Sequence, residues 1–476
     1  MKRLPGTHFT AGMSVVLLLL NGCVAPERNV SSSRVKAPSG YVQTSPKGTA
    51  THPATRPEEQ PSTTDGAQDI GAILDRVVAQ RSVPGLAAVV LRGDRIIALG
   101  VGGVRKSGAP ERITIQDQFL LCSGTKAMTA TLAALAVEKR MLSWTTTVGE
   151  VFLASGAKLH PEWASATLAQ LLNHRAGAPN DTAYLWKILR LHFFSQGSPS
   201  EKRRLLVGHV LSHPPAYSPG SRFLYTSLDY FVVAAMLEKV TGQSWEDLIQ
   251  ERLWQPLGIT TGGFGTPGTR SKVDQPWGHW GGIDSVFYRP GHPVAPGSLW
   301  GQLGGEPFYA PAGTAHMTIT DWAKFIALHL RGDPANPRRS EALLSSGSFA
   351  TLHACGQIIE NDSGLPAASS SLISQMPGSQ TQSGYEFGWF FERQTWANGG
   401  RPGDIGRVLR SLGDSGWVHV DALFAPEIDF AVLVICNQGG VDNRPAAMAC
   451  NDAASELINE FAPTIGKRAK EDVPLN

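Results

Sequence analysis

The sequence has little charge and little cysteine. Only 17% of its 476 residues are charged, and the formal net charge is +2. A chain this close to neutral lacks the basic surface that binds nucleic acid or acidic polymers, so we expect a small-molecule or peptide partner and no nucleic acid. The five cysteines include no C-x-x-C pair, which argues against a zinc or thiol-redox site.

The N-terminus lacks an apolar run long enough to cross a membrane. Its apolar segment ends with Val15–Leu20 and follows Lys2 and Arg3, whereas a spanning helix needs about 20 apolar residues. A short apolar run after basic residues is typical of an export signal. We expect residues 1–22 to be a signal peptide.

The end of this segment, Leu20-Asn21-Gly22-Cys23, resembles the lipobox of bacterial lipoproteins, although Asn21 is an unusual residue at its position. The resemblance implies cleavage before Cys23, lipidation of that cysteine and a membrane-anchored protein in the periplasm. Val24 is not an aspartate, which implies the outer membrane if the cell is Gram-negative. The alternative is an ordinary secretory signal with a chance cysteine, but no A-x-A-like cleavage site lies nearby.

The chain then divides into a tether and one large domain. Residues 24 to about 66 are rich in Ser, Thr, Pro and Gly. Such a segment cannot bury enough apolar surface to offset its ordering entropy, so we expect 23–67 to be a disordered tether that carries the lipid at its start. About 400 residues follow, a length common for one enzyme domain with an inserted helical lobe. We expect that domain at 68–465 and a C-terminal tail at 466–476.

Apolar periodicity predicts an α/β fold, with a mainly antiparallel sheet flanked by helices and an inserted all-helical lobe. A Gly-Asp turn joins the first two strands and explains Arg92-Gly93-Asp94 better than an adhesion signal does. The expected elements are a helix at 70–78, strands at 86–91 and 96–101, a helix-rich region at 123–257, strands at 418–424 and 430–436, and a final helix that contains Ala447 and Leu457.

The tetrad Ser123-Gly124-Thr125-Lys126 opens an amphipathic stretch with helical spacing. Side chains three residues apart on a helix lie about 5–6 Å apart at Cβ, so the hydroxyl of Ser123 and the amine of Lys126 would be neighbours. A neutral lysine in that place can take the proton of a serine nucleophile. S-x-x-K also arises by chance from a helix-capping serine and a solvated lysine. The pair therefore needs support from elsewhere in the chain.

A second polar cluster, at 219–227, lies in the helix-rich region. Pro219-Gly220 forms a turn, which leaves Tyr225 on a loop between helices rather than on a packed face. Taken alone, Tyr225 would be interpreted as a core aromatic residue whose hydroxyl has a hydrogen-bond partner. Together with Ser123 and Lys126, it becomes a candidate functional residue.

These three residues resemble the catalytic residues of the serine β-lactamase and penicillin-binding protein superfamily, in particular its class C β-lactamase and esterase-like branch. Six segments within 68–462 follow the family's order. The resemblance implies a DD-peptidase or β-lactamase-like transpeptidase fold, with Ser123 as nucleophile and Lys126 and Tyr225 in proton transfer. The segments are Phe119–Lys126, Leu168–Pro179, Tyr225–Ser227, Leu237–Gly242 with Pro256–Gly258, Pro311–Thr314, and Pro426-Glu427 with Asn437.

Two positions depart from the family pattern. Ser227 stands where the family has an asparagine, so one hydroxyl replaces a two-ended amide. Counting back from Pro426 places Ser411-Leu412-Gly413 where relatives carry Lys-Thr-Gly or His-x-Gly, and Ser411 then replaces a cation or imidazole. Arg410 cannot take that place, because successive strand residues face opposite sides. The register Asp414-Ser415-Gly416 is less favoured, since it leaves the strand too short.

The resemblance also implies an oxyanion hole made by the backbone N–H groups of Ser123 and Asp414, with substrate contacts from Ser227, Ser411 and Gly413. We expect a serine hydrolase that acts through an acyl-enzyme on an ester, amide or peptide, with neither a metal nor an organic cofactor. The missing cation favours an esterase or D-peptidase over an efficient β-lactamase, and peptidoglycan-derived peptides are candidate substrates. The alternative is a catalytically weak protein on the same fold that binds cell-wall peptide.

Other candidate sites carry less weight. His209 and His213 have the spacing of a zinc pair, but no glutamate stands between them as in H-E-x-x-H. His174 and His316 are expected to hold loops by hydrogen bonds. The segment 262–310 is dense in Gly, Pro and aromatic residues, and a lid and a packed insert explain it equally well.

The cysteines after Cys23 are interpreted as structural. Cys122 precedes the candidate nucleophile, but its apolar neighbours indicate a small buried side chain rather than a second nucleophile. Cys436 ends an expected strand and Cys450 lies in the following helix, so the two could pair in an oxidising compartment. The sequence leaves that pairing open.

Overall fold

In the computed structural model, the described residues all belong to the unit Ser62–Asn476. The expected signal peptide, the lipidated Cys23, nearly all of the tether and the tail at 466–476 lie outside the described residues. Among the described helices, none is both long and apolar enough to span a bilayer. The described residues are 66–153, 156, 158–281, 290–298, 301, 306–340, 343–356, 383–398, 404–440 and 444–463.

An eight-stranded sheet forms the base of this unit. Its strands are β1 (Gln68–Asp69), β2 (Gly85–Arg92), β3 (Arg95–Gly103), β9 (Gly384–Glu386), β10 (Trp389–Gln394), β11 (Gly406–Asp414), β12 (His419–Ala425) and β13 (Phe430–Cys436). They run in the order β1-β3-β2-β13-β12-β11-β10-β9, and only β1 and β3 pair in parallel. The two predicted hairpins are confirmed, and β9 to β11 extend the sheet beyond them.

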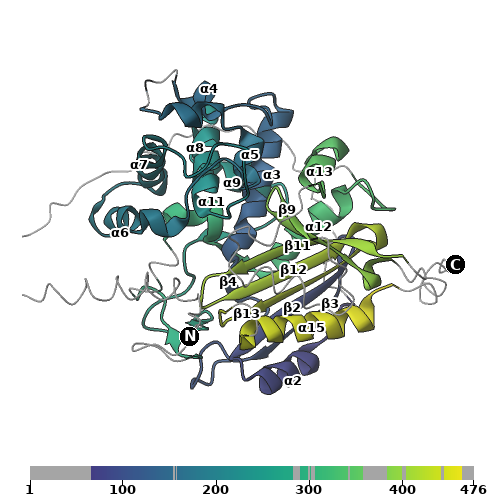
Figure 1. Cartoon of the computed structure of the whole chain (residues 1–476). Coiled ribbons are helices and arrows are strands. Elements are labelled where there is room, and N and C mark those ends of the chain that lie inside the picture. Colours follow the sequence, from purple (N-terminus) through teal and green to yellow (C-terminus); the bar gives the residue numbers. More distant parts are fainter. Residues whose placement is uncertain are drawn as a thin grey trace, which may run out of the picture. The chain divides into compact units, whose positions relative to one another are not determined.

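Different helices cover the two faces of the sheet. On one face, α2 (Gly71–Arg81) and α15 (Pro445–Phe461) lie side by side, as Figure 1 shows, and both match predicted helices. On the other face, α12 (Ile319–Gly332) contacts β2, β12 and β13. The sheet is therefore buried on both sides at its centre.

The central strand β13 is apolar along its whole length because both of its faces are buried. Val432 and Val434 belong to the core that includes residues of α2 and α15, whereas Leu433 and Ile435 belong to the core beneath α12 and the helical lobe. Successive side chains of a strand point to opposite faces, so the run serves two cores at once. Full burial of such a side chain contributes about 1.5–3 kcal/mol.

The helical lobe is inserted between β3 and the C-terminal half of the sheet. Its central helices, α3 (Thr125–Glu138) and α8 (Ser227–Thr241), are buried on nearly all sides. The shorter helices are α4 (Val148–Phe152), α5 (Leu168–Leu172), α6 (Leu185–Phe194), α7 (Pro199–Leu211), α9 (Trp245–Ile249), α11 (Ala310–Gly313) and α13 (Ser346–Leu352). The small sheets are β4 (Gln118–Leu120), β8 (Ala315–Thr318) and β5 (Gly263–Phe264), and β6 (Gly278–His279) with β7 (Pro293–Val294).

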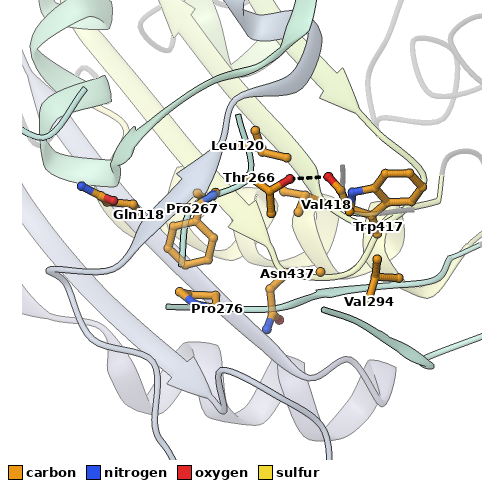
Figure 2. Close-up of a pocket in the computed structure, with 12 residues that line it drawn as sticks. Gln118, Leu120, Thr266, Pro267, Pro276, Val294, Trp417, Val418 and Asn437 are labelled. Carbon is orange, nitrogen blue, oxygen red and sulfur yellow. Dashed lines mark hydrogen bonds between the residues drawn. The ribbon is translucent and has the colours of Figure 1, made fainter. Parts of the chain in front are cut away.

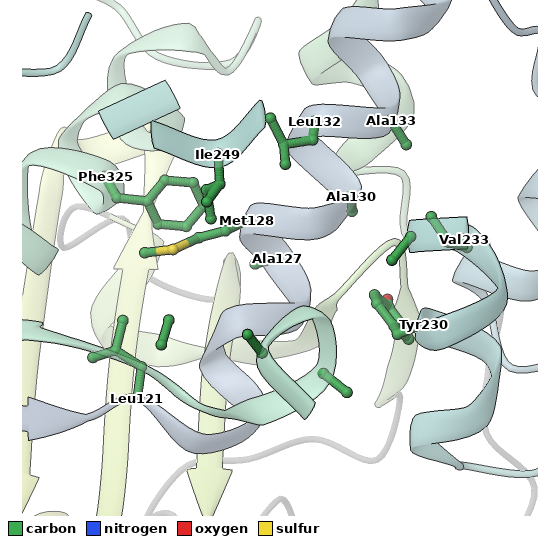
Figure 3. Close-up of a cluster of buried hydrophobic side chains, with 14 of the residues drawn as sticks. Leu121, Ala127, Met128, Ala130, Leu132, Ala133, Tyr230, Val233, Ile249 and Phe325 are labelled. Carbon is green, nitrogen blue, oxygen red and sulfur yellow. The ribbon is translucent and has the colours of Figure 1, made fainter. Parts of the chain in front are cut away.

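Small side chains on α3 allow close packing around it. Figure 3 shows Met128 of α3 beside Phe325 and Ile249, while Ala130 lies on the side that faces α8 and its Tyr230; all five are buried. Both α8 and α11 contact α3. Because tightly packed interiors resist displacement, this arrangement fixes the residues at the start of α3.

A carboxylate lies buried in the sheet without a hydrogen-bond partner. Both carboxylate oxygens of Glu392 in β10 are unpartnered within the described structure, near the buried ion pair of Arg410 and Asp421 (2.6 Å). Burial raises the pKa of Glu392 from its ordinary value of 4.5 to about 7, against the lowering effect of Arg410. The unfolded chain therefore releases this proton at lower pH than the folded chain does. The protonated carboxyl group of Glu392 therefore contributes fully to the free energy of unfolding below pH 4.5, and this contribution is lost as the pH rises to about 7.

We predict that Glu392→Gln raises the free energy of unfolding at about pH 8 by about 3 kcal/mol and changes it little at about pH 4, because the amide cannot ionise. Urea unfolding followed by tryptophan fluorescence at both pH values measures the difference. The matched control is Glu111→Gln, which removes an exposed carboxylate. The same stabilisation in both variants, or a gain at about pH 4 as large as at about pH 8, would contradict this account.

Candidate active site

The candidate nucleophile lies between a short strand and the central helix of the lobe. β4 leads into one 3-10 turn at Cys122–Gly124, and α3 begins at Thr125. Ser123 therefore precedes the α-helix, whereas the sequence suggested its first turn. Cys122 has a φ of 49°, a left-handed conformation that residues other than glycine seldom adopt. Strained turns of this kind occur preferentially at functional sites, and Ser123 is only half-buried there.

Lys126 lies where a proton acceptor for Ser123 is needed. The residue is 1% exposed, and its Nζ is 3.0 Å from Ser123 Oγ. Nζ also donates a hydrogen bond to the carbonyl oxygen of Ala312 at 2.8 Å. The same nitrogen lies 4.9 Å from the ring centre of Tyr225 and 5.7 Å from that of Tyr230. A lysine held in this way can accept the serine proton while it is neutral.

Tyr225 comes from the loop that precedes α8, as the sequence predicts. Its ring packs against those of His174 and Tyr385, with centroids 4.4 and 5.7 Å away. Among the hydrogen bonds of the described residues, none joins Tyr225 Oη to Ser123 or Lys126. The three predicted residues are thus brought together, with Lys126 Nζ beside the ring of Tyr225.

His174 and Asp229 form a buried layer that supports the tyrosine loop. His174 Nδ1 lies 3.2 Å from Asp229 Oδ2 and accepts a long hydrogen bond from the backbone N–H of Thr226, at 3.5 Å. Burial lowers the pKa of His174 and raises the pKa of Asp229. The carbonyl of His174 accepts from Leu224 N–H at 2.8 Å. The expectation that His174 holds its loop by hydrogen bonds is confirmed.

The end of β11 packs directly against the nucleophile turn. A Cβ on Gly413 would lie 2.5 Å from the carbonyl oxygen of Leu121 and 2.9 Å from the backbone nitrogen of Ser123, so only glycine fits there. Ser411 is on the same side of the strand, and its Oγ would lie 3.1 Å from a Cβ added to Gly124. Within the described residues, β10 pairs with β11 only up to Arg410, which leaves the strand edge beyond it unpaired by a strand.

These contacts agree with the expected register for Ser411-Leu412-Gly413. Arg410 turns to the opposite face and forms hydrogen bonds to Asp421 at 2.8 and 2.6 Å, so it cannot supply a cation beside Ser123. Ser411 is 1% exposed, and its hydroxyl has no hydrogen-bond partner in the described structure. Asp414 follows at the end of the strand, where its carboxylate accepts hydrogen bonds from the backbone N–H groups of Gly416 (2.7 Å) and Gly440 (2.8 Å).

No sequence pattern predicts the carboxylate that lies beside the Tyr225 loop. Asp181 Oδ1 accepts hydrogen bonds from Thr226 Oγ1 at 2.6 Å and from the backbone N–H of Ser227 at 2.8 Å. These partners lie 45 and 46 positions away in the chain, and Ala312 lies 186 positions from Lys126. The only sequence feature near Ala312 is the segment Pro311–Thr314, which resembles a turn found in the family.

The remaining predicted histidines are structural. His316 Nδ1 bonds to the carbonyl oxygen of Gly265 at 2.7 Å, as expected of a residue that holds a loop. His213 Nδ1 bonds to the carbonyl oxygen of His209 at 2.8 Å. Across the described part of the chain, no group of three or more potential ligands could hold a metal ion.

The cysteines after Cys23 are free thiols in the structure, including Cys436 and Cys450. The disulfide that the sequence left open is therefore not formed. Cys122 is buried, and burial raises its pKa to about 12. A thiol that stays protonated is a poor nucleophile, which agrees with its interpretation as a small buried side chain.

The described part of segment 262–310 packs against the sheet. His279 Nδ1 bonds to the carbonyl oxygen of Asn437 at 2.7 Å, and the backbone N–H of Trp277 donates to Arg105 at 2.9 Å. A lid role is not tested, because 282–289, 299–300 and 302–305 lie outside the described residues.

A small cavity lies between this segment and the strands, near Asn437, Trp417 and Thr266 (Figure 2). Its volume is about 10 Å³, which suits one water molecule, and none of Ser123, Lys126 and Tyr225 lines it. A larger open pocket of about 390 Å³ lies on the lobe, next to the loop that carries Asp181. The residues around it are Pro179, Ala183, Tyr184, Trp186, Lys187, His209, His213, Pro214 and Ala216.

Known proteins resemble the chain over most of the described domain. Residues 70–455 match a family model described as Beta-lactamase. A putative D-alanyl-D-alanine carboxypeptidase of Escherichia coli O157:H7 is 26% identical over 208 residues, which are 39% of this chain and 45% of that protein. The unguisins hydrolase ungD of Aspergillus violaceofuscus is 27% identical over 187 residues, which are 37% of this chain and 31% of that protein. The chain thus spans less than half the length of these two curated relatives.

A solved structure shares the architecture. The octameric penicillin-binding protein homologue from Pyrococcus abyssi aligns with a TM-score of 0.59 at 20% sequence identity, over 81% of this chain and 75% of that chain. At this identity the likeness concerns the fold alone. It confirms the expected DD-peptidase and β-lactamase-like fold, a mainly antiparallel sheet with flanking helices and an inserted helical lobe.

Proposed function

Because the chain belongs to the beta-lactamase family, we propose that it is a serine hydrolase that acts through an acyl-enzyme on an ester, amide or peptide bond. The observation that carries the proposal is the 3.0 Å contact between Ser123 Oγ and the buried Nζ of Lys126. Burial excludes water from the lysine, and the contact with Ala312 fixes its direction. A nucleophile within hydrogen-bond reach of an oriented base is the arrangement that covalent catalysis requires.

In the first half-reaction, Ser123 Oγ attacks the substrate carbonyl carbon while its proton passes to neutral Lys126. The carbonyl π electrons move to the oxygen, and the backbone N–H groups of Ser123 and Asp414 stabilise this oxyanion, each by roughly 3–4 kcal/mol. When the oxyanion collapses, the bond to the leaving group breaks, and the proton held by Lys126 transfers to that group. Tyr225, whose ring lies beside Lys126, is the candidate to relay this proton.

In the second half-reaction, water attacks the acyl-enzyme and gives one proton to Lys126. The second tetrahedral intermediate expels Ser123, which takes that proton back, and the acid product leaves. This cycle needs no group beyond the side chains and backbone amides of the chain itself. Gly413 supports it because its missing Cβ lets β11 reach the nucleophile turn.

The substrate class follows from the charge of the cleft. Ser411 is neutral and Arg410 is turned away to Asp421, so the β11 side offers no cation to a substrate carboxylate. We therefore propose esterase or D-peptidase activity in preference to efficient β-lactam hydrolysis, with peptidoglycan-derived peptides among the candidate substrates. The rival proposal is a cell-wall peptide-binding protein, which the absence of a bond from the Tyr225 hydroxyl to Ser123 or Lys126 favours.

Intact-mass spectrometry separates the enzyme from the binding protein. We predict that a fluorophosphonate adds covalently to the wild-type protein and that Ser123→Ala removes both this adduct and the turnover of short-chain esters, with an unchanged circular dichroism spectrum. Lys126→Ala should lose about as much activity, because members of one proton-transfer unit are not additive. The conservative control is Thr129→Ser, also on α3. This variant keeps the hydroxyl that donates a hydrogen bond to the carbonyl oxygen of Pro311. Wild-type turnover in Ser123→Ala would overturn the assignment of the nucleophile.

The location of the protein is a further part of this proposal. We propose that Cys23 carries a lipid that anchors the domain in the periplasm, at the outer membrane in a Gram-negative cell. Cys23→Ser should then release the protein into the soluble periplasmic fraction with its esterase activity intact, because a flexible tether makes the domain independent of its anchor. Fractionation and immunoblotting measure the distribution. A variant that stays in the membrane fraction would exclude lipidation as the anchor.

The neutral Ser411 predicts a measurable substrate preference. Ser411→Lys or Ser411→His should raise kcat/KM for a chromogenic cephalosporin by about 10- to 100-fold and change that for an uncharged acetate ester far less, since charge-assisted hydrogen bonds are the stronger kind. The control is Ser415→Lys, at the turn after the strand. If both substrates respond equally, or if the wild type already prefers the cephalosporin, Ser411 does not determine the charge preference.

A further inference from the structure

A carboxylate without a cation partner lies at the edge of the candidate active site. Asp181 begins the short turn at Asp181–Tyr184, on the loop between α5 and α6. Its Oδ1 accepts hydrogen bonds from Thr226 Oγ1 and from the backbone N–H of Ser227. Thr226 directly follows Tyr225, whose ring centre is 4.9 Å from Lys126 Nζ. Asp181 is therefore held one residue away from the tyrosine that contacts the candidate base.

The charge of Asp181 is not neutralised by a neighbour. Within the described structure, no lysine, arginine or histidine forms an ion pair with it, and its second oxygen, Oδ2, makes no hydrogen bond. The nearby Glu306 differs, because Lys202 lies 3.2 Å from its carboxylate and His192 contacts it as well. Burial raises the pKa of Tyr309, and the negative charge of Asp181 raises it further. The charge of Asp181 therefore acts on the segment just before Ala312, whose carbonyl oxygen accepts the hydrogen bond from Lys126.

Support of the fold does not require this charge. The helix α8 is already capped by Thr226, whose Oγ1 accepts from the backbone N–H of Leu228 at 3.3 Å. The two hydrogen bonds to Asp181 use one oxygen only, and the amide oxygen of an asparagine can accept both, without the charge assistance that a carboxylate gives at the start of a helix. A carboxylate supplies in addition one negative charge, with one oxygen left for a ligand.

From this geometry we infer that Asp181 is a specificity-determining residue that binds a protonated amine in the acyl part of the substrate. The inference rests on the proposed acyl transfer at Ser123 and adds the chemical class of the acyl group, an aminoacyl ester or peptide. The two sides of the cleft then act in the same direction. Ser411 on β11 provides no cation for a carboxylate, while Asp181 on the lobe provides an anion for an ammonium group.

Two esters of equal size test the inference. Alanine ethyl ester, as each enantiomer, carries an ammonium group where ethyl isobutyrate carries a methyl group. For the preferred enantiomer, we expect wild-type kcat/KM to exceed that of ethyl isobutyrate. Asp181→Asn should lower this ratio by about 10- to 100-fold, because the variant keeps the acceptor and removes the charge. Raising the ionic strength should reduce the ratio in the wild type more than in the variant.

Asp94→Asn is the matched control, because it removes one carboxylate from the turn between β2 and β3, where Asp94 pairs with Arg331. It should leave the ratio unchanged. A thermal melt of Asp181→Asn shows whether the loop and α8 remain folded. An unchanged ratio in Asp181→Asn, or an equal loss on both esters, would mean that Asp181 only anchors the loop, and the inference would be overturned.

The same measurements distinguish the two proposals. If hydrolysis disappears in Ser123→Ala but the wild type shows no preference for the ammonium ester, the serine hydrolase stands and the amine site is wrong. If the wild type hydrolyses neither ester and forms no fluorophosphonate adduct, the proposed function is overturned and the inference falls with it.

Discussion

The structure depends on how the amine of Lys126 is accommodated inside the protein. Removing a polar group from water costs free energy unless the protein supplies replacement contacts. Lys126 obtains them from Ser123 Oγ, from the carbonyl oxygen of Ala312 and from the rings of Tyr225 and Tyr230. These partners come from the nucleophile turn, α11, the Tyr225 loop and α8. The position of one nitrogen thus requires four separate segments to be packed together, which are the same segments that form the candidate active site.

A buried polar layer supports that arrangement. His174 and Asp229 are in contact at 3.2 Å, and His174 accepts a hydrogen bond from the backbone N–H of Thr226, which ties the tyrosine loop to this layer. The rings of His174, Tyr225 and Tyr385 pack against one another in the same layer. In the proposed function, the charge preference of the site is set by Asp181 on the lobe and by the buried, neutral Ser411 on β11.

In the proposed function, the helical lobe and the strand edge take different parts in substrate recognition. β11 contributes backbone and a neutral hydroxyl, because a Cβ does not fit at Gly413 and Ser411 carries no charge. The lobe contributes Asp181, which accepts hydrogen bonds from Thr226 Oγ1 and from the first amide of α8. Under this proposal, the charge of the preferred substrate depends on residues other than the nucleophile and the lysine.

The sequence by itself determined the local features. Short apolar runs identified β2, β3, β12 and β13, and the three-residue spacing of Ser123 and Lys126 predicted their contact, because such patterns depend on local sequence and backbone geometry. Tertiary structure decided the rest. The carbonyl of Ala312 at Lys126, the carboxylate of Asp181 at the Tyr225 loop and the ring contact of Tyr225 join residues far apart in the chain, and the thiols of the last strand and helix remain free. No local pattern specifies these contacts, because they arise when the lobe packs against the sheet.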